Sequence, residues 1–170
     1  MSFRDILDIY PLSPMQEGML FHSLYDQNSG VYFNQVALTL EGQLDLAALK
    51  RAWQRVMQRH SILRSSFEWE EIEKPLQVVH REVELELRYE DLGELSKEAE
   101  EERVKQWLAA NLDQPFDLSQ APLMRLGVLQ TGKERQQFFW SFHHILLDGW
   151  SVSLVLGEVF SFYRGEIEGT

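Results

Sequence analysis

The sequence predicts an α/β fold, a two-layer sandwich in which helices pack on a mixed sheet. Segments rich in β-branched and aromatic residues alternate with segments whose apolar residues recur at helical spacing, which is the pattern of such layered folds. The chain has 170 residues, enough for one domain with a substantial core. Its apolar fraction of 44% and aromatic fraction of 12% are typical of a globular protein and argue against disorder.

The first predicted helix begins after Ser13 and runs to about residue 25. Ser13 followed by Pro14 is typical of an N-cap and a first helical position, and Glu17 in the first turn is expected to complete the cap. The preceding segment, from Ile6 to Pro14, is short and apolar, and it is expected to be rich in turns. The side chains predicted to face inward are Met15, Met19, Leu20 and Leu24.

A strand over residues 31–40 and a helix over residues 46–60 are predicted next, with Asp45 as the N-cap of the helix. Apolar residues at helical spacing predict that one face of this helix packs against the sheet: Leu46, Leu49, Ala52, Trp53, Val56 and Met57. The opposite face is predicted to be exposed and basic: Lys50, Arg51, Arg55 and Arg59.

Arg64 is notable because it lies in an otherwise apolar stretch, residues 61–69, that is predicted to form a strand. One interpretation places Arg64 on the exposed face of this strand. The other places it in the interior, where it needs a partner because an unpaired buried charge is very costly. This stretch alone supports both interpretations equally.

Short strands are predicted at residues 76–79 and 85–89, followed by a charged helix over residues 97–112 that Ser96 caps. This helix carries a narrow apolar stripe: Val104, Trp107, Leu108 and Leu112. A hairpin of strands at residues 122–130 and 135–142 comes next. The last predicted helix begins near Trp150 and is apolar nearly all round, which is typical of a helix buried in a layered fold.

Charge and composition exclude several classes of function. The formal net charge of −11 argues against nucleic acid and against anionic membranes as partners. Acidic residues gather between Glu82 and Glu102, as a solvated face or as a docking surface for a basic partner. The chain has no cysteine, so disulfides, thiolate chemistry and cysteine-based metal sites are excluded. We find no signal-peptide pattern and no apolar run near the roughly 20 residues of a membrane span, so we expect a cytoplasmic location.

The junction between the hairpin and the last helix carries the residues best suited to chemistry. His143 and His144 are adjacent, so on an extended strand they point to opposite faces and do not readily share a metal ion. A histidine exchanges protons near neutral pH. Asp148 could orient the His144 ring, or pair with a cation to fix the loop. Gly149 leaves room for a ligand carbonyl at a helix N-terminus, which favours developing negative charge.

These features favour attack of a nucleophile on a thioester or ester carbonyl, with a purely structural histidine pair as the alternative. Other chemistries lack their motifs. The sequence has no G-x-S-x-G elbow of the serine hydrolases. It also has no P-loop and no dinucleotide-binding fingerprint.

Three stretches in order resemble the core motifs of condensation domains from nonribosomal peptide synthetases. They are SPMQEGMLFHSL at residues 13–24, RHSILRSSF at residues 59–67 and HHILLDGWS at residues 143–151, which matches the H-H-x-x-x-D-G signature. The resemblance spans essentially the whole chain. It implies a lobe similar to chloramphenicol acetyltransferase, so that residues 1–170 form the N-terminal lobe of a domain whose C-terminal lobe is absent here.

The resemblance also implies an activity. In this family, a tunnel between two lobes receives a donor peptidyl or aminoacyl thioester and the amine of an acceptor aminoacyl thioester, and a peptide bond forms. Upstream and downstream peptidyl carrier proteins deliver both on phosphopantetheine arms, so no tightly bound cofactor and no metal are expected. Adjacent adenylation or epimerisation domains are further expected partners. The isolated lobe is predicted to be inactive, with an unusually apolar tunnel face.

Carried over residue by residue, the resemblance assigns roles at the junction. His144 is placed at the reaction centre, as a base or as a positioning group, and Gly149 is placed near the thioester in the tunnel. His143 is expected to be mainly structural. Asp148 is expected to pair with Arg64 and hold the loop, which would give Arg64 a buried partner.

Two other functions compete with this one. A freestanding trimeric acyltransferase dependent on coenzyme A would carry its histidine motif late in the chain, as here, but the first two motifs are of the synthetase type. A non-catalytic docking relative would not need His144, Asp148 and Gly149 intact. Within the family, the first motif and Leu146-Leu147 in the third resemble domains that take a D-configured donor.

Overall fold

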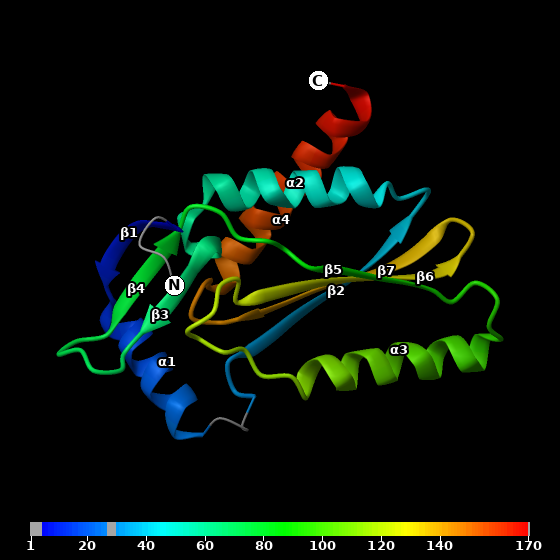
Figure 1. The fold of residues 1–170 in the computed structure, drawn as a ribbon. Helices are drawn as coiled ribbons and strands as arrows, with labels where there is room; N and C mark the ends of the chain where they lie inside the picture. Colours follow the sequence, from blue (N-terminus) through cyan, green and yellow to red (C-terminus); the bar gives the residue numbers. More distant parts are fainter. Residues whose placement is uncertain (1–4, 27–29, 170) are drawn as a thin grey trace.

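The computed structural model describes residues 5–26 and 30–169, which form two sheets and four α-helices (Figure 1). The larger sheet has the order β2-β7-β6-β5, and its pairs are antiparallel except for the parallel pair β5–β6. Its strands are β2 (Phe33–Glu41), β7 (Arg135–His143), β6 (Met124–Gly132) and β5 (Leu87–Asp91). The smaller, antiparallel sheet has the order β1-β4-β3. Its strands are β1 (Ile6–Pro11), β4 (Leu76–His80) and β3 (Ser65–Glu68).

The helices cover the larger sheet on both faces. They are α1 (Pro14–Tyr25), α2 (Leu46–Arg59), α3 (Lys97–Leu112) and α4 (Gly149–Glu168), with a short 3-10 helix η2 (Ser61–Arg64) after α2. Figure 1 shows α2 and α4 together on one face of the sheet and α3 on the other, with α1 beside the smaller sheet. The predicted α/β fold with a mixed sheet is therefore confirmed.

The main core lies between α2 and the larger sheet. Trp53 of α2 and Trp140 of β7 are fully buried, with ring centroids 4.8 Å apart in an edge-to-face arrangement. Val155 and Val159 of α4 join the same cluster. The predicted apolar face of α2 is confirmed, and its N-cap is Asp45, whose side chain accepts a hydrogen bond from the backbone N–H of Ala48.

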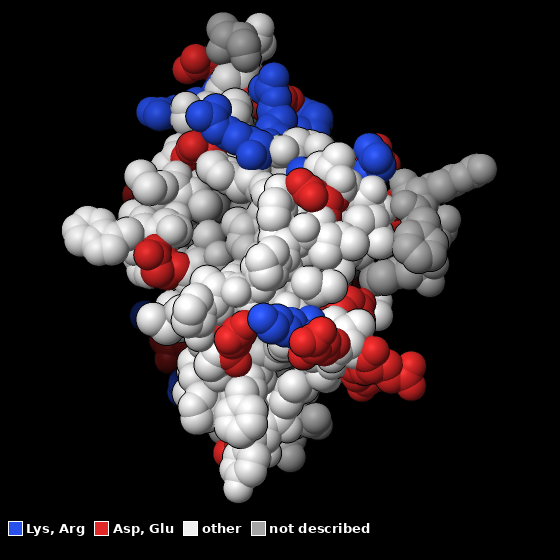
Figure 2. Space-filling view, turned by 90° about the vertical axis from the view of Figure 1, so that its left-hand side faces the viewer, with Lys and Arg blue, Asp and Glu red and all other residues white. Residues whose placement is uncertain are grey.

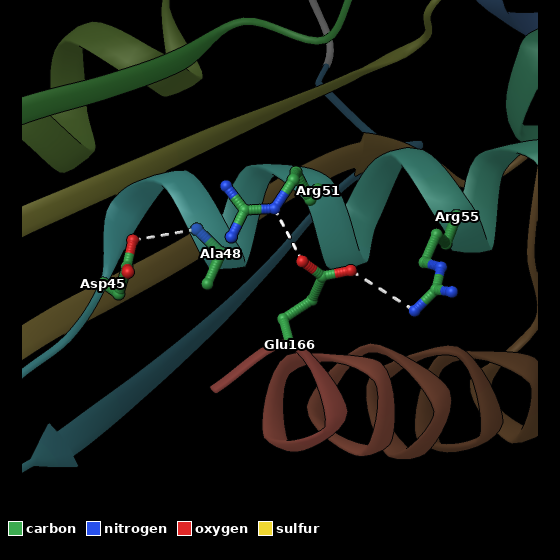
Figure 3. A network of polar contacts seen from close by, with 5 residues as sticks. All are labelled: Asp45, Ala48, Arg51, Arg55 and Glu166. Carbon is green, nitrogen blue, oxygen red and sulfur yellow. Dashed lines mark hydrogen bonds and ion pairs between the residues drawn. The ribbon is translucent and has the colours of Figure 1, made fainter. Parts of the chain in front are cut away.

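Ion pairs hold α4 against α2 near the C-terminal end of α4 (Figure 3). Glu166 accepts hydrogen bonds from Arg51 at 2.6 Å and from Arg55 at 3.3 Å. The Tyr163 hydroxyl accepts a third bond from the backbone N–H of Asp45, at 3.0 Å. In Figure 2, basic side chains gather at the top of the molecule, over α2 and the end of α4, while most of the face below is uncharged. These contacts orient α4, whose first turn belongs to the site described below.

A smaller core packs α3 against the opposite face of the sheet. Trp107 stacks on Phe139 of β7 with ring centroids 4.6 Å apart, and Val104 and Leu108 complete the contact. The predicted stripe of α3 is confirmed at these three positions. Leu112, the fourth, is 53% exposed because it lies at the end of the helix, beyond the sheet contact.

Several sequence predictions were wrong in detail. Residues 6–11 form strand β1 rather than a turn-rich segment, because they pair with β4 over its whole length. Residues 61–64 form a 3-10 helix, so the strand begins only at Ser65. Gln16, not Glu17, completes the capping box of α1, since Gln16 is the N3 residue after Ser13.

The predicted inward face of α1 is confirmed at Met19, Leu20 and Leu24 but is wrong at Met15, and the prediction that α4 is buried nearly all round was also wrong. Met15 is 73% exposed, in contrast to the buried Leu20 of the same helix. In α4, Val155 and Val159 are the buried residues, whereas Trp150 and Leu154 are 86% and 70% exposed. The reason is that α4 packs along one stripe, which contains Val152 and Val155 in its first two turns, whereas Trp150 and Leu154 lie outside this stripe. Within the described residues, no helix is long and apolar enough to cross a membrane.

Candidate functional site

The candidate site lies where β7 ends and α4 begins, as the sequence predicts. Backbone bonds fix the end of β7 on both sides: His143 N–H donates to the Leu123 carbonyl at 3.0 Å, and His144 N–H donates to the Tyr32 carbonyl at 2.8 Å. A turn then leads to Gly149, the first residue of α4. The two histidines are therefore held on a rigid frame before any ligand binds.

The His144 side chain is half-buried, and a single contact sets its chemistry. Its Nδ1 lies 2.7 Å from the Leu147 carbonyl oxygen. Because a carbonyl only accepts, Nδ1 carries the proton. In the neutral ring, Nε2 is then unprotonated, with a lone pair available to accept a proton. The backbone of the turn thus selects the tautomer in which His144 can act as a base.

His143 is buried and neutral. Its Nδ1 lies 3.1 Å from the backbone N–H of Ile145, and its Nε2 lies 3.1 Å from Ser23 Oγ on α1. Burial, with a smaller effect of the neighbouring His144, lowers the pKa of His143 from 6.5 to about 4. At neutral pH this ring neither gains nor releases protons readily.

Asp148 is exposed and serves as the N-cap of α4. Its Oδ1 accepts the backbone N–H of Ser151 at 2.8 Å. A hydrogen bond from the Ser151 side chain, followed by the one from its backbone, lowers the pKa of Asp148. The carboxylate is thus engaged by the first turn of the helix, where negative charge is favoured.

Arg64 is 4% exposed, so the buried interpretation is correct. Its partners, however, are three backbone carbonyls. Nε donates to Met57 at 2.8 Å, and one terminal nitrogen donates to Arg81 at 3.0 Å and, in a shorter contact, to His80.

The expected pairing of Asp148 with Arg64 is therefore wrong in this structure. The physical reason is that carbonyls at the last turn of α2 and the end of β4 lack backbone donors, and a guanidinium supplies several N–H groups at once. Asp148 is exposed and occupied by the α4 cap. Arg64 joins the end of α2 to the end of β4 through these hydrogen bonds. It therefore supports the position of these elements and makes no bond to Asp148.

Gly149 is exposed and borders open space. A Cβ added at this residue would meet no atom of the described chain within 4 Å. The space beside the first turn of α4 is thus open to a ligand, and the helix behind it is 20 residues long, with its positive dipole end at this point. The roles assigned to Gly149 and His144 in catalysis stay predictions.

A pocket of about 910 Å³ opens on the His143 side of the junction. Ser23 and His143 both line it, together with aromatic side chains that include Tyr32, Phe33 and Phe116. Neither lysine nor arginine is among the described residues that line it. Sequence reasoning missed this pocket and the role of Ser23, although Ser23 belongs to the first motif.

Within residues 5–26 and 30–169, no group of three or more His, Asp or Glu side chains is placed to hold a metal ion. What the junction offers is an imidazole whose Nδ1 is held by the Leu147 carbonyl, next to open space and a helix N-terminus. Such a set is suited to accepting a proton from a nucleophile and stabilising negative charge on a carbonyl oxygen.

Comparison with known proteins is specific. The family model of the Condensation domain matches residues 6–170. A linear gramicidin synthase of Brevibacillus parabrevis is 48% identical over 98% of this chain, which spans 3% of that relative. Gramicidin S synthase 2 of Brevibacillus brevis is 39% identical over 93% of this chain, which spans 4% of that relative. The chain thus corresponds to a small part of the curated relatives it matches.

Solved structures share the fold. The starter condensation domain of rhizomide synthetase superposes with a TM-score of 0.87 at 23% identity, covering 96% of this chain and 41% of that one. The first condensation domain of the calcium-dependent antibiotic synthetase, solved with a substrate analogue, gives a TM-score of 0.87 at 21% identity, covering 97% of this chain and 41% of that one. At such identities the likeness shows the fold alone.

Proposed function

The chain belongs to the Condensation domain family, and from this we propose that it is the N-terminal lobe of a condensation domain in a nonribosomal peptide synthetase. The complete domain would join a donor peptidyl or aminoacyl thioester to the amine of an acceptor aminoacyl thioester. The observation that carries the proposal beyond family membership is the bond from His144 Nδ1 to the Leu147 carbonyl at 2.7 Å, which leaves Nε2 free.

In the proposed reaction, the acceptor amine attacks the donor thioester carbonyl carbon. A C–N bond forms and the C–S bond breaks. The proton lost by the amine passes to Nε2 of His144 and then to the leaving thiolate sulfur. An α-amine has a pKa of roughly 8, so a fair fraction is already neutral at cellular pH. His144 therefore needs only to orient the amine and receive its proton as the tetrahedral intermediate forms.

The other junction residues support this reaction. Gly149 borders open space at the start of α4, where a thioester carbonyl would fit, and the helix dipole would stabilise charge developing on its oxygen. His143 and Asp148 would hold the turn on either side of His144. We propose no resident cofactor; both substrates would arrive on phosphopantetheine arms.

The proposed partners follow from this reaction. They are the upstream and downstream peptidyl carrier proteins, adjacent adenylation or epimerisation domains and the C-terminal lobe. The exposed Trp150 and Leu154, at the start of α4, are apolar surface suited to burial against that lobe. We propose a cytoplasmic location and, from the first and third motifs, a D-configured donor.

The experiment that tests the function uses the complete domain with both carrier proteins loaded. We expect amide formation with a D-configured donor, and loss of most of it in His144→Ala. His22→Ala is the matched control, because His22 is an exposed histidine outside the junction. Undiminished product from His144→Ala would exclude the role of His144, and equal rates with an L-configured donor would exclude the subtype.

The isolated 170-residue chain tests the lobe assignment. We expect it to form no amide from two loaded carrier proteins, since one wall of the tunnel is missing. A freestanding acyltransferase is the alternative. A trimer on gel filtration that turns over acetyl-coenzyme A would favour that alternative and overturn the proposed function.

A further inference from the structure

We propose that Ser23 of α1 is a positioning residue for the reaction, because its hydroxyl oxygen accepts the Nε2 proton of His143 and so holds that ring and, through the turn, the ring of His144. This inference rests on the proposed function only where activity is measured. Its structural basis is a chain of hydrogen bonds from α1 to the junction, between residues 120 positions apart in the sequence. The direction of these bonds follows from the two backbone groups at the ends of the chain, the Ile145 N–H, which only donates, and the Met19 carbonyl, which only accepts.

The first step is the His143 ring. Ile145 contributes a backbone N–H, which only donates, so His143 Nδ1 is the acceptor at 3.1 Å. A neutral imidazole carries one proton, which must then lie on Nε2. That proton is donated to Ser23 Oγ at 3.1 Å. The Ser23 hydroxyl proton is in turn donated to the Met19 carbonyl at 2.8 Å.

The second step is the turn. His143 holds two successive N–H groups of it, that of Ile145 with its ring and that of Leu146 with its carbonyl oxygen, at 3.1 Å each. These bonds set the path of the backbone up to Leu147. The Leu147 carbonyl is the acceptor that keeps the proton on His144 Nδ1. A shift of the His143 ring therefore moves the group that selects the reactive tautomer of His144.

The third step is the support of Ser23 itself. Its hydroxyl bonds back to the carbonyl four residues earlier, a contact that fixes the side chain against its own helix. The helix is fixed in turn, because the Gln16 side chain closes the capping box and also donates to Gln77 of β4 at 3.1 Å. Ser23 thus presents its oxygen to the junction from a rigid element.

A serine next to a histidine also suggests a nucleophile with its base, and the structure argues against that role. A base needs an unprotonated nitrogen facing the hydroxyl. In His143, Nδ1 is occupied by Ile145, and Nε2 carries the proton donated to Ser23. The Ser23 oxygen is an acceptor here, so it orients the ring and does not attack a substrate.

The test compares Ser23→Ala with Ser23→Thr, which keeps a hydroxyl, and with Ser161→Ala, an exposed serine of α4. Alanine is the better helix former, so α1 stays folded in Ser23→Ala. Nitrogen-15 NMR of the 170-residue chain reports which nitrogen of His143 and His144 is protonated. Amide formation by the complete domain, with both carrier proteins loaded, gives kcat and the KM for the acceptor.

We expect Ser23→Ala to shift the nitrogen-15 and proton resonances of the His143 Nε2–H group, which loses its acceptor, and to lower kcat by about tenfold, the effect of one hydrogen bond. The acceptor KM should stay within about twofold, Ser23→Thr should restore both readouts, and Ser161→Ala should match the unaltered protein. Unchanged resonances of the His143 Nε2–H group in Ser23→Ala, or a Ser23→Thr variant as slow as Ser23→Ala, would overturn the proposal. If the unaltered complete domain forms no amide, the proposed function fails, while the NMR comparison still decides whether Ser23 controls His143.

Discussion

Trp107 occupies the space that a side chain on residue 127 would need. A Cβ added to Gly127 would lie 2.1 Å from the Trp107 ring, far inside contact distance. Gly127 is in β6 and Trp107 in α3, so this close approach sets how near α3 lies to the sheet. The glycine is required by the packing of the tryptophan, since its backbone does not have a positive φ.

Gly127→Ala should lower the free energy of unfolding by about 1–3 kcal/mol, because either the indole or the strand must move. Urea unfolding followed by tryptophan fluorescence measures this change. Gly157→Ala is the matched control: Gly157 lies inside α4 with no atom within 4 Å of an added Cβ. That change should stabilise the protein by about 0.5–1 kcal/mol. Equal effects of the two substitutions would contradict the contact.

The pKa of His143 predicts a loss of stability in mild acid. Its pKa is about 4 in the folded protein and near 6.5 in the unfolded chain. As pH falls from 6.5 to 4, the unfolded state binds a proton that the folded state does not. The free energy of unfolding should therefore fall by about 3 kcal/mol across this window from His143 alone, and this contribution is intact above pH 6.5.

Chemical unfolding at several pH values between 7 and 4 tests this prediction by comparing the unaltered chain with His143→Gln. Carboxylates with lowered pKa values, such as Asp148, also contribute less to the free energy of unfolding as the pH falls, and they do so equally in both proteins. The difference in slope isolates His143. Parallel pH profiles for the two proteins would show that His143 is not held neutral by the fold.

Arg64 and Asp148 should act independently, because the structure gives them different partners. Arg64→Ala removes the donor to three backbone carbonyls, two of them in buried contacts, and should lower the free energy of unfolding by about 2–4 kcal/mol. Asp148→Ala removes the N-cap of α4 and should cost about 1 kcal/mol. The double variant should match the sum within about 0.5 kcal/mol. A coupling free energy well above about 0.5 kcal/mol would instead support the ion pair between Arg64 and Asp148 that the sequence predicted.

The ion pairs of Glu166 should contribute little and should weaken in salt. Arg51 and Arg55 have side chains about half exposed, at 51% and 52%. Exposed pairs of this kind are worth about 0.2–1 kcal/mol each and are screened by ions. Glu166→Gln should lower the melting temperature slightly at low salt and less at 1 M salt, an effect that thermal unfolding detects. The control is Glu168→Gln, since Glu168 is an exposed residue of the same helix. An equal shift of the melting temperature in this variant would argue against a specific contribution from the ion pairs of Glu166.

Local signals in the sequence predicted much of the fold. Ser13, Asp45 and Ser96 were expected to cap helices and do so, because capping depends on a side chain and the next few residues. The buried face of α2 followed from spacing alone. Strand β1 was missed because its residues become a strand only by pairing with β4, about 70 positions later.

The location of the site was predictable from the sequence, but the hydrogen-bond partners of its residues were not. The motif at residues 143–151 correctly indicated a strand-to-helix junction. The pairing of Arg64 with Asp148 failed because a sequence does not show which backbone carbonyls lack donors. The contact between Ser23 and His143 joins distant segments, and no spacing rule predicts it.

That contact has a consequence for the construction of hybrid synthetases. Ser23 and Met19 lie in the first motif, whereas His143 and Ile145 lie in the third, yet their hydrogen bonds make them one unit. A chimaera whose crossover falls between α1 and β7 draws the two halves of this unit from different parents. Parents that differ at residue 23 or 143 would then yield a hybrid with mismatched halves, even when every motif is intact. Crossovers placed before α1 or after the first turn of α4 inherit the unit whole.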